Sequence, residues 1–283
     1  MSARRIALAL LMPVLLLASG CTARSEPSSI TVDVTQGRTD RDGRVIVMDV
    51  TNTGTTAIEL VTARLDTPQF AEPAVWERGT TLDPGRTVSL RAQLAAPVCP
   101  VPATPQPTVT VGYRDAEGYE HTVTAPPTQS IGTLAMIEKD DCVAVLAARR
   151  ADIRVADTVT WTPGAHRAAE LRMLVSPTGD GALEIVEARG TVLLGLDDGT
   201  GSAVQSVPIG ITADAAHGNQ EFTLHLLPNR CDRHAIAEDK RGTLMTLALR
   251  FDDGTEGVAY FRPSDEVKAS LYAFVTDLCG TGL

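Results

Sequence analysis

The sequence predicts an all-β protein of two tandem β-sandwich domains related by internal duplication, with a short C-terminal helix in the second domain. Short runs of alternating apolar and polar residues, separated by turns that contain Gly or Asp, recur along the 283 residues. This pattern is typical of sandwiches and barrels. A segment of the first half recurs in the second half, and the cysteines repeat with it.

The first twenty residues have the organisation of a bacterial export signal. Arg4 and Arg5 form a basic start, and residues 6–17 are apolar. This run is too short to span a bilayer, which needs about 20 residues. The following Ala-Ser-Gly-Cys, residues 18–21, resembles a lipobox. The resemblance implies lipidation of Cys21 and anchoring on the extracytoplasmic face of the cell membrane; an ordinary secretory signal or a buried N-terminal helix is the alternative.

The composition is acidic and argues against nucleic acid as a partner. Removal of residues 1–20 takes away Arg4 and Arg5 and no acidic residue, so the net charge would change from −10 to −12. Binding to nucleic acid needs a basic surface. The basic residues include only three lysines, and this usage is typical of GC-rich genomes such as those of actinobacteria.

The internal repeat is clearest between residues 50–64 and 175–189, where eight of fifteen positions are identical without a gap. Besides Cys21, the chain holds four cysteines, and an even number in an exported chain indicates disulfides. The repeat places one pair in each half, so it predicts the pairs Cys99–Cys142 and Cys231–Cys279. Closing loops of this size should contribute about 3–4 kcal/mol of stability through chain entropy.

Strand signals follow the repeat through both halves. In the first half, strands are expected at residues 30–34, 44–50, 57–65, 87–94, 108–113 and 119–124. In the second half, they are expected at residues 153–161, 170–175, 183–196, 221–226, 243–251 and 257–261. The turn Asn52-Thr53-Gly54 and the later Pro84-Gly85 resemble those of Ig-like sandwich domains of bacterial surface proteins, which implies the same architecture here.

A helix is predicted near the C-terminus, because Asp265 and Glu266 suit a helix N-terminus and an apolar stripe follows. The stripe consists of Val267, Leu271, Phe274, Val275 and Leu278. The expected organisation is a signal peptide (1–20), a lipid-anchored tether (21–29), a first domain (30–148) and a second domain (149–283).

Motifs for catalysis, metal or cofactor binding are missing from the sequence. It has no Gly-x-Ser-x-Gly, no His-Glu-x-x-His and no phosphate-binding glycine loop. The histidines are scattered without the spacing of metal ligands. Asp197-Asp198 and Asp252-Asp253 each precede Gly, which favours turns over paired catalytic carboxylates. We therefore predict no enzyme activity, no metal and no cofactor.

One charged loop, residues 230–241, is the candidate binding segment. Cys231 lies 20 positions before Phe251, whereas Cys99 lies 14 before Tyr113, so the second half has about six extra residues here. Inserted loops on rigid sandwiches often carry binding function. The alternative is a solvated loop whose charges pair with one another. The candidate residues are Arg230, Asp232, Arg233, His234, Asp239, Lys240 and Arg241.

These observations favour a non-enzymatic, membrane-anchored lipoprotein that binds or supports another protein of the cell envelope. A lipoprotein that binds a small molecule or glycan for a transporter is the second interpretation. Such binders usually have a cleft between α/β lobes, which the strand-rich pattern does not favour. A hydrolase would need a nucleophile and a base that the sequence does not offer.

The lipidation hypothesis predicts the behaviour of Cys21→Ala. Without a thiol to carry the lipid, this variant should appear in the medium or stay unprocessed, while Ser19→Ala should remain in the membrane as the control. Fractionation and the mass of the N-terminal peptide measure both. Unchanged membrane retention of Cys21→Ala would overturn the hypothesis.

Overall fold

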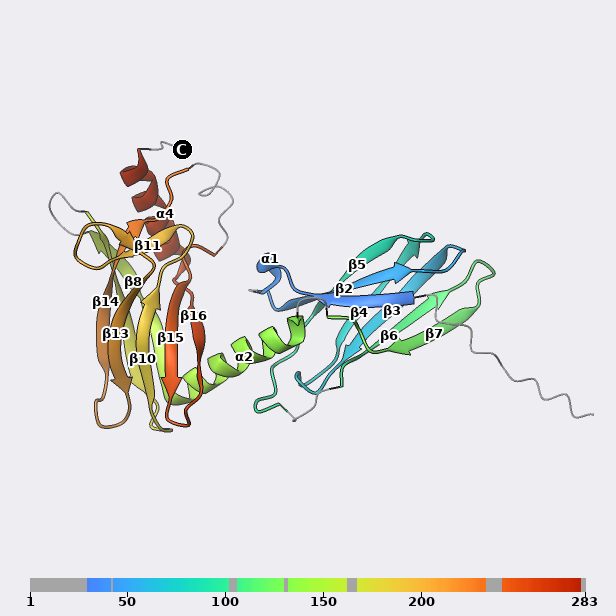
Figure 1. The fold of residues 1–283 in the computed structure, drawn as a ribbon, viewed down its shortest axis with the longest axis horizontal. Helices are drawn as coiled ribbons and strands as arrows, with labels where there is room; N and C mark the ends of the chain where they lie inside the picture. The colour runs from blue at the N-terminus through green and yellow to red at the C-terminus, as the bar shows by residue number, and fades with distance from the viewer. Residues whose placement is uncertain are drawn as a thin grey trace, which may run out of the picture.

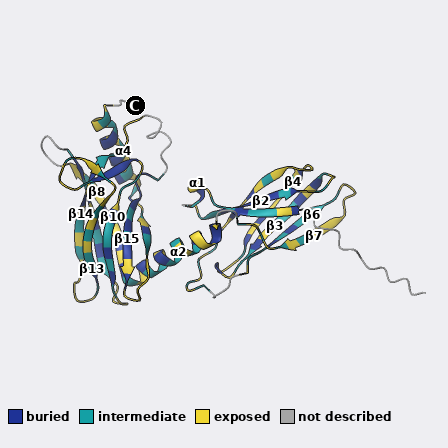
Figure 2. Ribbon diagram, viewed as in Figure 1, coloured by how far each residue is buried: buried dark blue, intermediate teal, exposed yellow. Residues whose placement is uncertain are grey.

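The computed structural model shows two β-sandwiches joined by a long helix, α2 (Figure 1). It describes residues 30–41, 43–101, 106–129, 132–161, 167–232 and 241–280. The expected signal peptide, the tether and Cys21 lie outside the described residues. The all-β fold class is confirmed, and buried residues gather between the two sheets of each sandwich (Figure 2).

The first sandwich packs a three-stranded sheet on a four-stranded sheet, both antiparallel. The smaller sheet has the order β1 (Ile30–Thr35), β2 (Val45–Asn52), β5 (Thr87–Gln93). The larger has the order β4 (Ala74–Leu82), β3 (Ile58–Asp66), β6 (Thr108–Arg114), β7 (Glu120–Ala125). One helical turn, α1 (Arg38–Arg41), connects β1 to β2.

The second sandwich begins where α2 (Thr133–Arg150) ends and has a four-stranded and a five-stranded sheet. The first has the order β13 (Ser206–Ala213), β10 (Leu183–Arg189), β15 (Met245–Phe251), β16 (Glu256–Phe261). The second has the order β12 (Ala203–Val204), β11 (Leu194–Asp197), β14 (Gln220–Pro228), β9 (Ala169–Pro177), β8 (Ala151–Trp161). Helix α4 (Asp265–Cys279) follows β16.

The two domains share a β-bulge at the same place in the repeat. The pairing of β3 shifts register between Leu60 and Thr62, and that of β10 shifts between Ile185 and Glu187. A bulge inserts one extra residue and bends the strand. The order β4-β3-β6-β7 corresponds to β13-β10-β15-β16. Descent of both domains from one duplicated ancestor stays a prediction.

Several elements differ from the sequence prediction. Strands β4 and β13 and the helix α2 were not expected, and residues 183–196 form two strands of different sheets instead of one. The chain leaves β10 at a turn in which the Thr191 hydroxyl accepts hydrogen bonds from the amides of Leu193 and Leu194, at 3.2 and 2.9 Å. This local side-chain contact competes with continued strand pairing.

Helix α2 belongs to both cores. Leu134 and Ile137 are buried in the first domain, whereas Val143 and Ala147 are buried in the second. Val143 comes nine residues after Leu134, or about two and a half turns, so the two halves use opposite faces of the helix. The change of core therefore lies within α2, before the expected division at residue 148.

Several contacts fix α2 to the first domain. Buried Gln69 donates to the carbonyl of Leu134 at 3.3 Å and to Glu138 at 2.7 Å. The disulfide Cys99–Cys142, with Cα atoms 5.6 Å apart, ties the middle of the helix to the segment after β5. In the second domain, Cys231–Cys279 joins the segment after β14 to the end of α4, with a Cα separation of 5.2 Å. Both pairings predicted from the repeat are confirmed.

The predicted C-terminal helix is confirmed as α4, with one correction to its apolar stripe. The Ser264 hydroxyl accepts from the amide of Val267 at 3.3 Å and caps the helix. Four residues of the stripe are buried, but Leu278 is 38% exposed. It lies in the last turn, next to the disulfide at Cys279.

The contact of α2 with β16 depends on Gly257. A Cβ at this position would lie 2.3 Å from Cγ2 of Val143, well inside van der Waals contact. We expect Gly257→Ala to lower the free energy of unfolding by about 1–3 kcal/mol through overpacking, measured by urea denaturation. Gly79→Ala is the control, because a Cβ there meets only Glu59 Oε1 at 3.5 Å. Equal stability of the two variants would contradict the assigned packing.

Candidate functional site

The structure describes only the two ends of the predicted binding loop. Arg230 and Asp232 form an ion pair of 2.8 Å at one end, beside the disulfide at Cys231. At the other end, the guanidinium of Arg241 lies 4.8 Å from the ring centroid of Tyr260, a cation–π arrangement. The other candidates, Arg233, His234, Asp239 and Lys240, lie outside the described residues.

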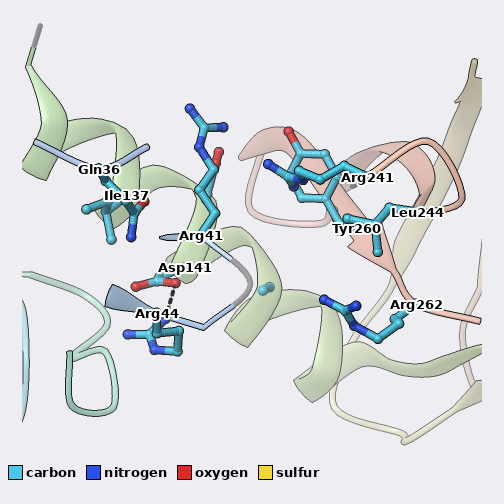
Figure 3. A pocket seen from close by; sticks show the side chains of 12 residues that line it. Gln36, Arg41, Arg44, Ile137, Asp141, Arg241, Leu244, Tyr260 and Arg262 are labelled. Atoms are coloured by element: carbon cyan, nitrogen blue, oxygen red, sulfur yellow. Dashed lines mark hydrogen bonds and ion pairs between the residues drawn. The ribbon is translucent and has the colours of Figure 1, made fainter. Parts of the chain in front are cut away.

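Arg241 lines a hollow of about 260 Å³ where the two domains meet (Figure 3). We call it the junction hollow. Its lining comes from the first domain, from α2 and from the second domain. The lining residues are Gln36, Arg41, Arg44, Ile137, Asp140, Asp141, Ala144, Arg241, Leu244, Ala259, Tyr260 and Arg262. Of the predicted loop residues that the structure describes, Arg241 lines this hollow.

On the first-domain side, the connection between β1 and β2 is held by buried Asp40. Its Oδ2 accepts a hydrogen bond from the amide of Gly37 at 3.0 Å, and its Oδ1 pairs with the guanidinium of Arg91. Because both carboxylate oxygens are engaged, α1 is attached firmly to the sheet. Arg41, the last residue of α1, is thereby presented to the junction hollow.

Arg44 links this connection to α2. Its backbone has a φ of 50°, in the left-handed region that few residues other than glycine adopt. Its side chain donates to Oδ1 of Asp141 at 2.5 Å and to the carbonyl of Ala95 at 2.8 Å, and Figure 3 shows the ion pair as a dashed line. Arg44 therefore balances Asp141 and joins the first sheet to the shared helix.

On the second-domain side, the lining residues lie just before β15, on β16 or just after it. The amide of Leu244 donates to the carbonyl of Arg241 at 3.0 Å, which forms a turn before β15. Tyr260 lies on β16, and Arg262 directly follows that strand. Arg41 and Arg241 thus reach the junction hollow from opposite domains (Figure 3).

Asp140 is a half-buried residue of α2 that lines the junction hollow and interacts electrostatically with Arg41 and Arg241. Burial raises the pKa of its carboxyl above the ordinary 3.8, and this effect outweighs the opposing attraction of Arg41 and Arg241. The neighbouring Asp141 adds to the increase. The ionised form of Asp140 therefore costs free energy in the folded protein.

The acid pairs of the second domain are in turns, as their sequence favoured. Asp197 accepts from the amide of Gly199 at 2.9 Å, and Asp253 accepts from that of Thr255 at 2.8 Å. Asp252 pairs with Arg150 at 2.9 Å and accepts from the amide of Ala182 at 3.2 Å. No group of His, Cys, Asp and Glu in the described part of the chain could hold a metal ion.

Sequence reasoning missed most of the junction hollow. Arg41 and Arg44 lie about two hundred residues from Arg241 and Arg262, and no spacing relates the two pairs. The only sequence signal was the charge of the loop that ends at Arg241. Detecting the rest requires knowing that α2 continues from one domain into the other.

The sequence matches no protein-family model and no curated protein. Red sea bream transglutaminase aligns with 85% of this chain at 11% identity and a TM-score of 0.21, and this chain spans 32% of its length. Spo0M, a sporulation control protein of Bacillus subtilis, aligns over 90% of this chain and 99% of its own, with 10% identity and a TM-score of 0.24. The YadV chaperone aligns over 78% of this chain and 93% of its own, with 12% identity and a TM-score of 0.20.

Similarities of this size carry no argument about function. None of the described helices combines the length and the apolar character that a membrane span requires.

The raised pKa of Asp140 predicts a pH-dependent gain in stability for Asp140→Asn. The cost of the carboxylate is present above its folded pKa and vanishes as pH falls below the unfolded value of 3.8. We therefore expect the variant to be more stable than the parent at pH 7, and the difference to narrow toward about pH 4. Urea unfolding at both pH values measures this.

Asp157→Asn, at an exposed position on β8, is the control and should change stability little at either pH. If Asp140→Asn is less stable than the parent at pH 7, the attraction between the Asp140 carboxylate and the arginines outweighs the free-energy cost of burying that carboxylate.

Proposed function

We propose that this chain is a non-enzymatic lipoprotein of the cell envelope that binds another envelope protein through the junction of its two domains. Lipidation at Cys21 would hold it on the extracytoplasmic face of the membrane, and residues 22–29 would form the tether. The observation that carries the proposal is the junction hollow, where arginines from both domains line a cavity beside the shared helix.

Rigidity supports a binding role. Each domain has a disulfide that ties the segment after a strand to a helix, and α2 packs into both cores. A surface held still before binding loses less conformational entropy when a partner binds. The two halves of the junction are therefore presented to a partner in a fixed arrangement.

In this proposal the partner also contacts the charged loop, residues 230–241. Its first end is held by Cys231–Cys279 and by the pair of Arg230 with Asp232. Its last residue, Arg241, lines the junction hollow. A partner that contacts the loop would thus lie next to the hollow.

Binding of a small molecule or glycan for a transporter is the second candidate. The observation that favours it is the junction hollow itself, because ligand sites are concave and often lie between domains. Its volume of about 260 Å³ is below the usual range of about 300–1,000 Å³, which favours the protein-binding role.

The proposal predicts that replacing residues 232–241 with the uncharged segment 100–107 abolishes partner capture. The replacement removes every charge of the loop except that of Arg230, including Arg241, and leaves all four disulfide cysteines. The variant should be exported and keep its melting temperature, while the protein captured by crosslinking in intact cells is lost. Mass spectrometry of the crosslinked product identifies the partner.

Tyr119→Ser is the matched control, since Tyr119 is 69% exposed at the far end of the first domain. This variant should capture the partner as the parent does. A folded loop variant that still captures the same protein would place the contact elsewhere, and a melting shift caused by a small ligand alone would favour the second candidate.

A further inference from the structure

We propose that one end of the first domain lies against the lipid surface to which the chain is anchored. This end consists of the turns at residues 53–57, 83–86 and 115–119, and we call it the turn end. The side chain of Tyr119 makes its contact with lipid. The inference rests on the proposed function, since it takes Cys21 to be lipidated, and it adds the orientation in which the protein is held on the membrane.

Strand pairing brings two of these turns together at the start of β1. Ile30, the first residue of β1, pairs with Asn52, the last residue of β2. The turn 53–57 directly follows Asn52. The carbonyl of Asn52 accepts a hydrogen bond from the amide of Gly85 at 2.8 Å, and its amide donates to the carbonyl of Arg86 at 3.1 Å. Ile30 therefore lies beside the turn before β3 and the turn before β5.

The third turn reaches the same end through the larger sheet. Strand β3 follows the turn 53–57, and Glu59 near its start pairs with Arg114. Arg114 is the last residue of β6, which the turn 115–119 joins to β7. Helix α2 lies at the opposite end of the domain (Figure 1). The start of β1 and all three turns thus share the end that is farthest from the second domain.

The chain between the predicted anchor and this end is short. Only residues 22–29 separate Cys21 from Ile30. An extended chain spans at most 3.3–3.6 Å per residue, so Cys21 lies no more than about 32 Å from Ile30. A lipid on Cys21 therefore keeps the start of β1 near the membrane and favours the turn end as the part of the domain that meets the lipid.

Tyr119 gives the turn end a side chain suited to a bilayer surface. At 69% exposure it is the most exposed large apolar side chain in the described part of the chain. Tyrosine is enriched where proteins meet a bilayer, because its ring enters the apolar layer while its hydroxyl stays with water and headgroups. The position of Tyr119 beside the anchored end gives this ring a lipid surface to contact.

The turn that carries Tyr119 is held by its own polar contacts. Oδ1 of Asp115 accepts hydrogen bonds from the amides of Glu117 and Tyr119, at 3.1 and 2.8 Å. Oδ2 of Asp115 lies 2.7 Å from Nε2 of His121. These contacts use the backbone of Tyr119 and leave its side chain exposed. A ring presented on a fixed turn loses less conformational entropy when it binds.

Charge is not the source of this contact. The three turns hold three acidic residues, Asp83, Asp115 and Glu117, and one basic residue, Arg86. Attraction to anionic headgroups needs clustered basic residues, which the turn end does not offer. The contact therefore depends on the lipid at Cys21 and on the apolar ring, and salt should change it little.

The same orientation holds the junction hollow away from the lipid. Arg44, which lines the hollow, directly precedes β2, and β2 ends at Asn52 beside the turn end. The eight residues of β2 span about 26 Å, at about 3.3 Å per residue. The junction and the charged loop are therefore held where another envelope protein can reach them.

The test uses the full lipidated chain in phosphatidylcholine vesicles that contain some lipid with a nitroxide on its headgroup. A fluorophore is attached to a cysteine introduced by Thr55→Cys or Glu117→Cys, both exposed at the turn end. Val192→Cys, at a position 54% exposed in the second domain, is the matched control. Because nitroxide quenches only nearby fluorophores, we expect quenching at residues 55 and 117, at low and high salt, and none at residue 192.

The role of the tyrosine is tested by adding Tyr119→Ser to the Thr55→Cys chain. Quenching at residue 55 should fall, because the turn end loses its contact with the lipid. Val75→Ser is the control, since it removes a side chain that is 40% exposed at the other end of the same sheet, and it should leave quenching unchanged. Both variants keep the lipid on Cys21 and should still sediment with the vesicles.

Equal quenching at residues 55, 117 and 192 would overturn the inference, and so would equal quenching in the Tyr119→Ser and Val75→Ser chains. If Tyr119→Ser fails to fold, as its melting temperature would show, the comparison of the three labelled positions decides. A chain that sediments with vesicles and captures its partner, but shows no quenching at the turn end, would retain the proposed function and lose this inference. A chain that does not sediment lacks the anchor, and both would then be overturned.

Discussion

The packing of one helix into two hydrophobic cores is the constraint on which the rest of the structure depends. Leu134 and Ile137 face the first domain, and Val143 and Ala147 face the second from the opposite side of α2. Neither domain can move along or around the helix without exposing these side chains, at about 25 cal/mol per Å² of apolar area. The absence of a side chain at Gly257 lets β16 approach the helix closely enough to bury Val143.

The junction hollow is a geometric result of this arrangement. Ile137 of the first core lines the hollow together with Asp140 and Ala144, so α2 forms one wall of the hollow. Arg41 and Arg241 are attached to different domains but face the same wall. Their proximity therefore follows from the helix, and not from local sequence.

The fold was predictable from the sequence as far as each feature depended on local pattern or on the repeat. Alternation identified most strands, and the repeat selected the pairing of Cys99 with Cys142 and of Cys231 with Cys279. Strand β4 was not predicted because Glu77, Arg78 and Gly79 interrupt its apolar pattern at exposed positions. Helix α2 was not predicted because its buried residues change from one face to another halfway along the helix, so no single apolar stripe runs along it. The hollow depends on both domains and had no signal beyond the charged loop.

The comparison of α2 with α4 shows what the longer helix adds to the same arrangement of buried residues and cysteine. Leu134, Ile137 and Cys142 precede one another at the same intervals as Leu271, Phe274 and Cys279, and in both helices the two apolar residues are buried and the cysteine is bonded. Helix α4 ends at its cysteine, whereas α2 continues through residues 143–150. This extension carries all the residues of α2 that are buried in the second domain's core, together with Arg150, which pairs with Asp252. About two further turns of helix therefore supply the contacts by which α2 packs against the second domain.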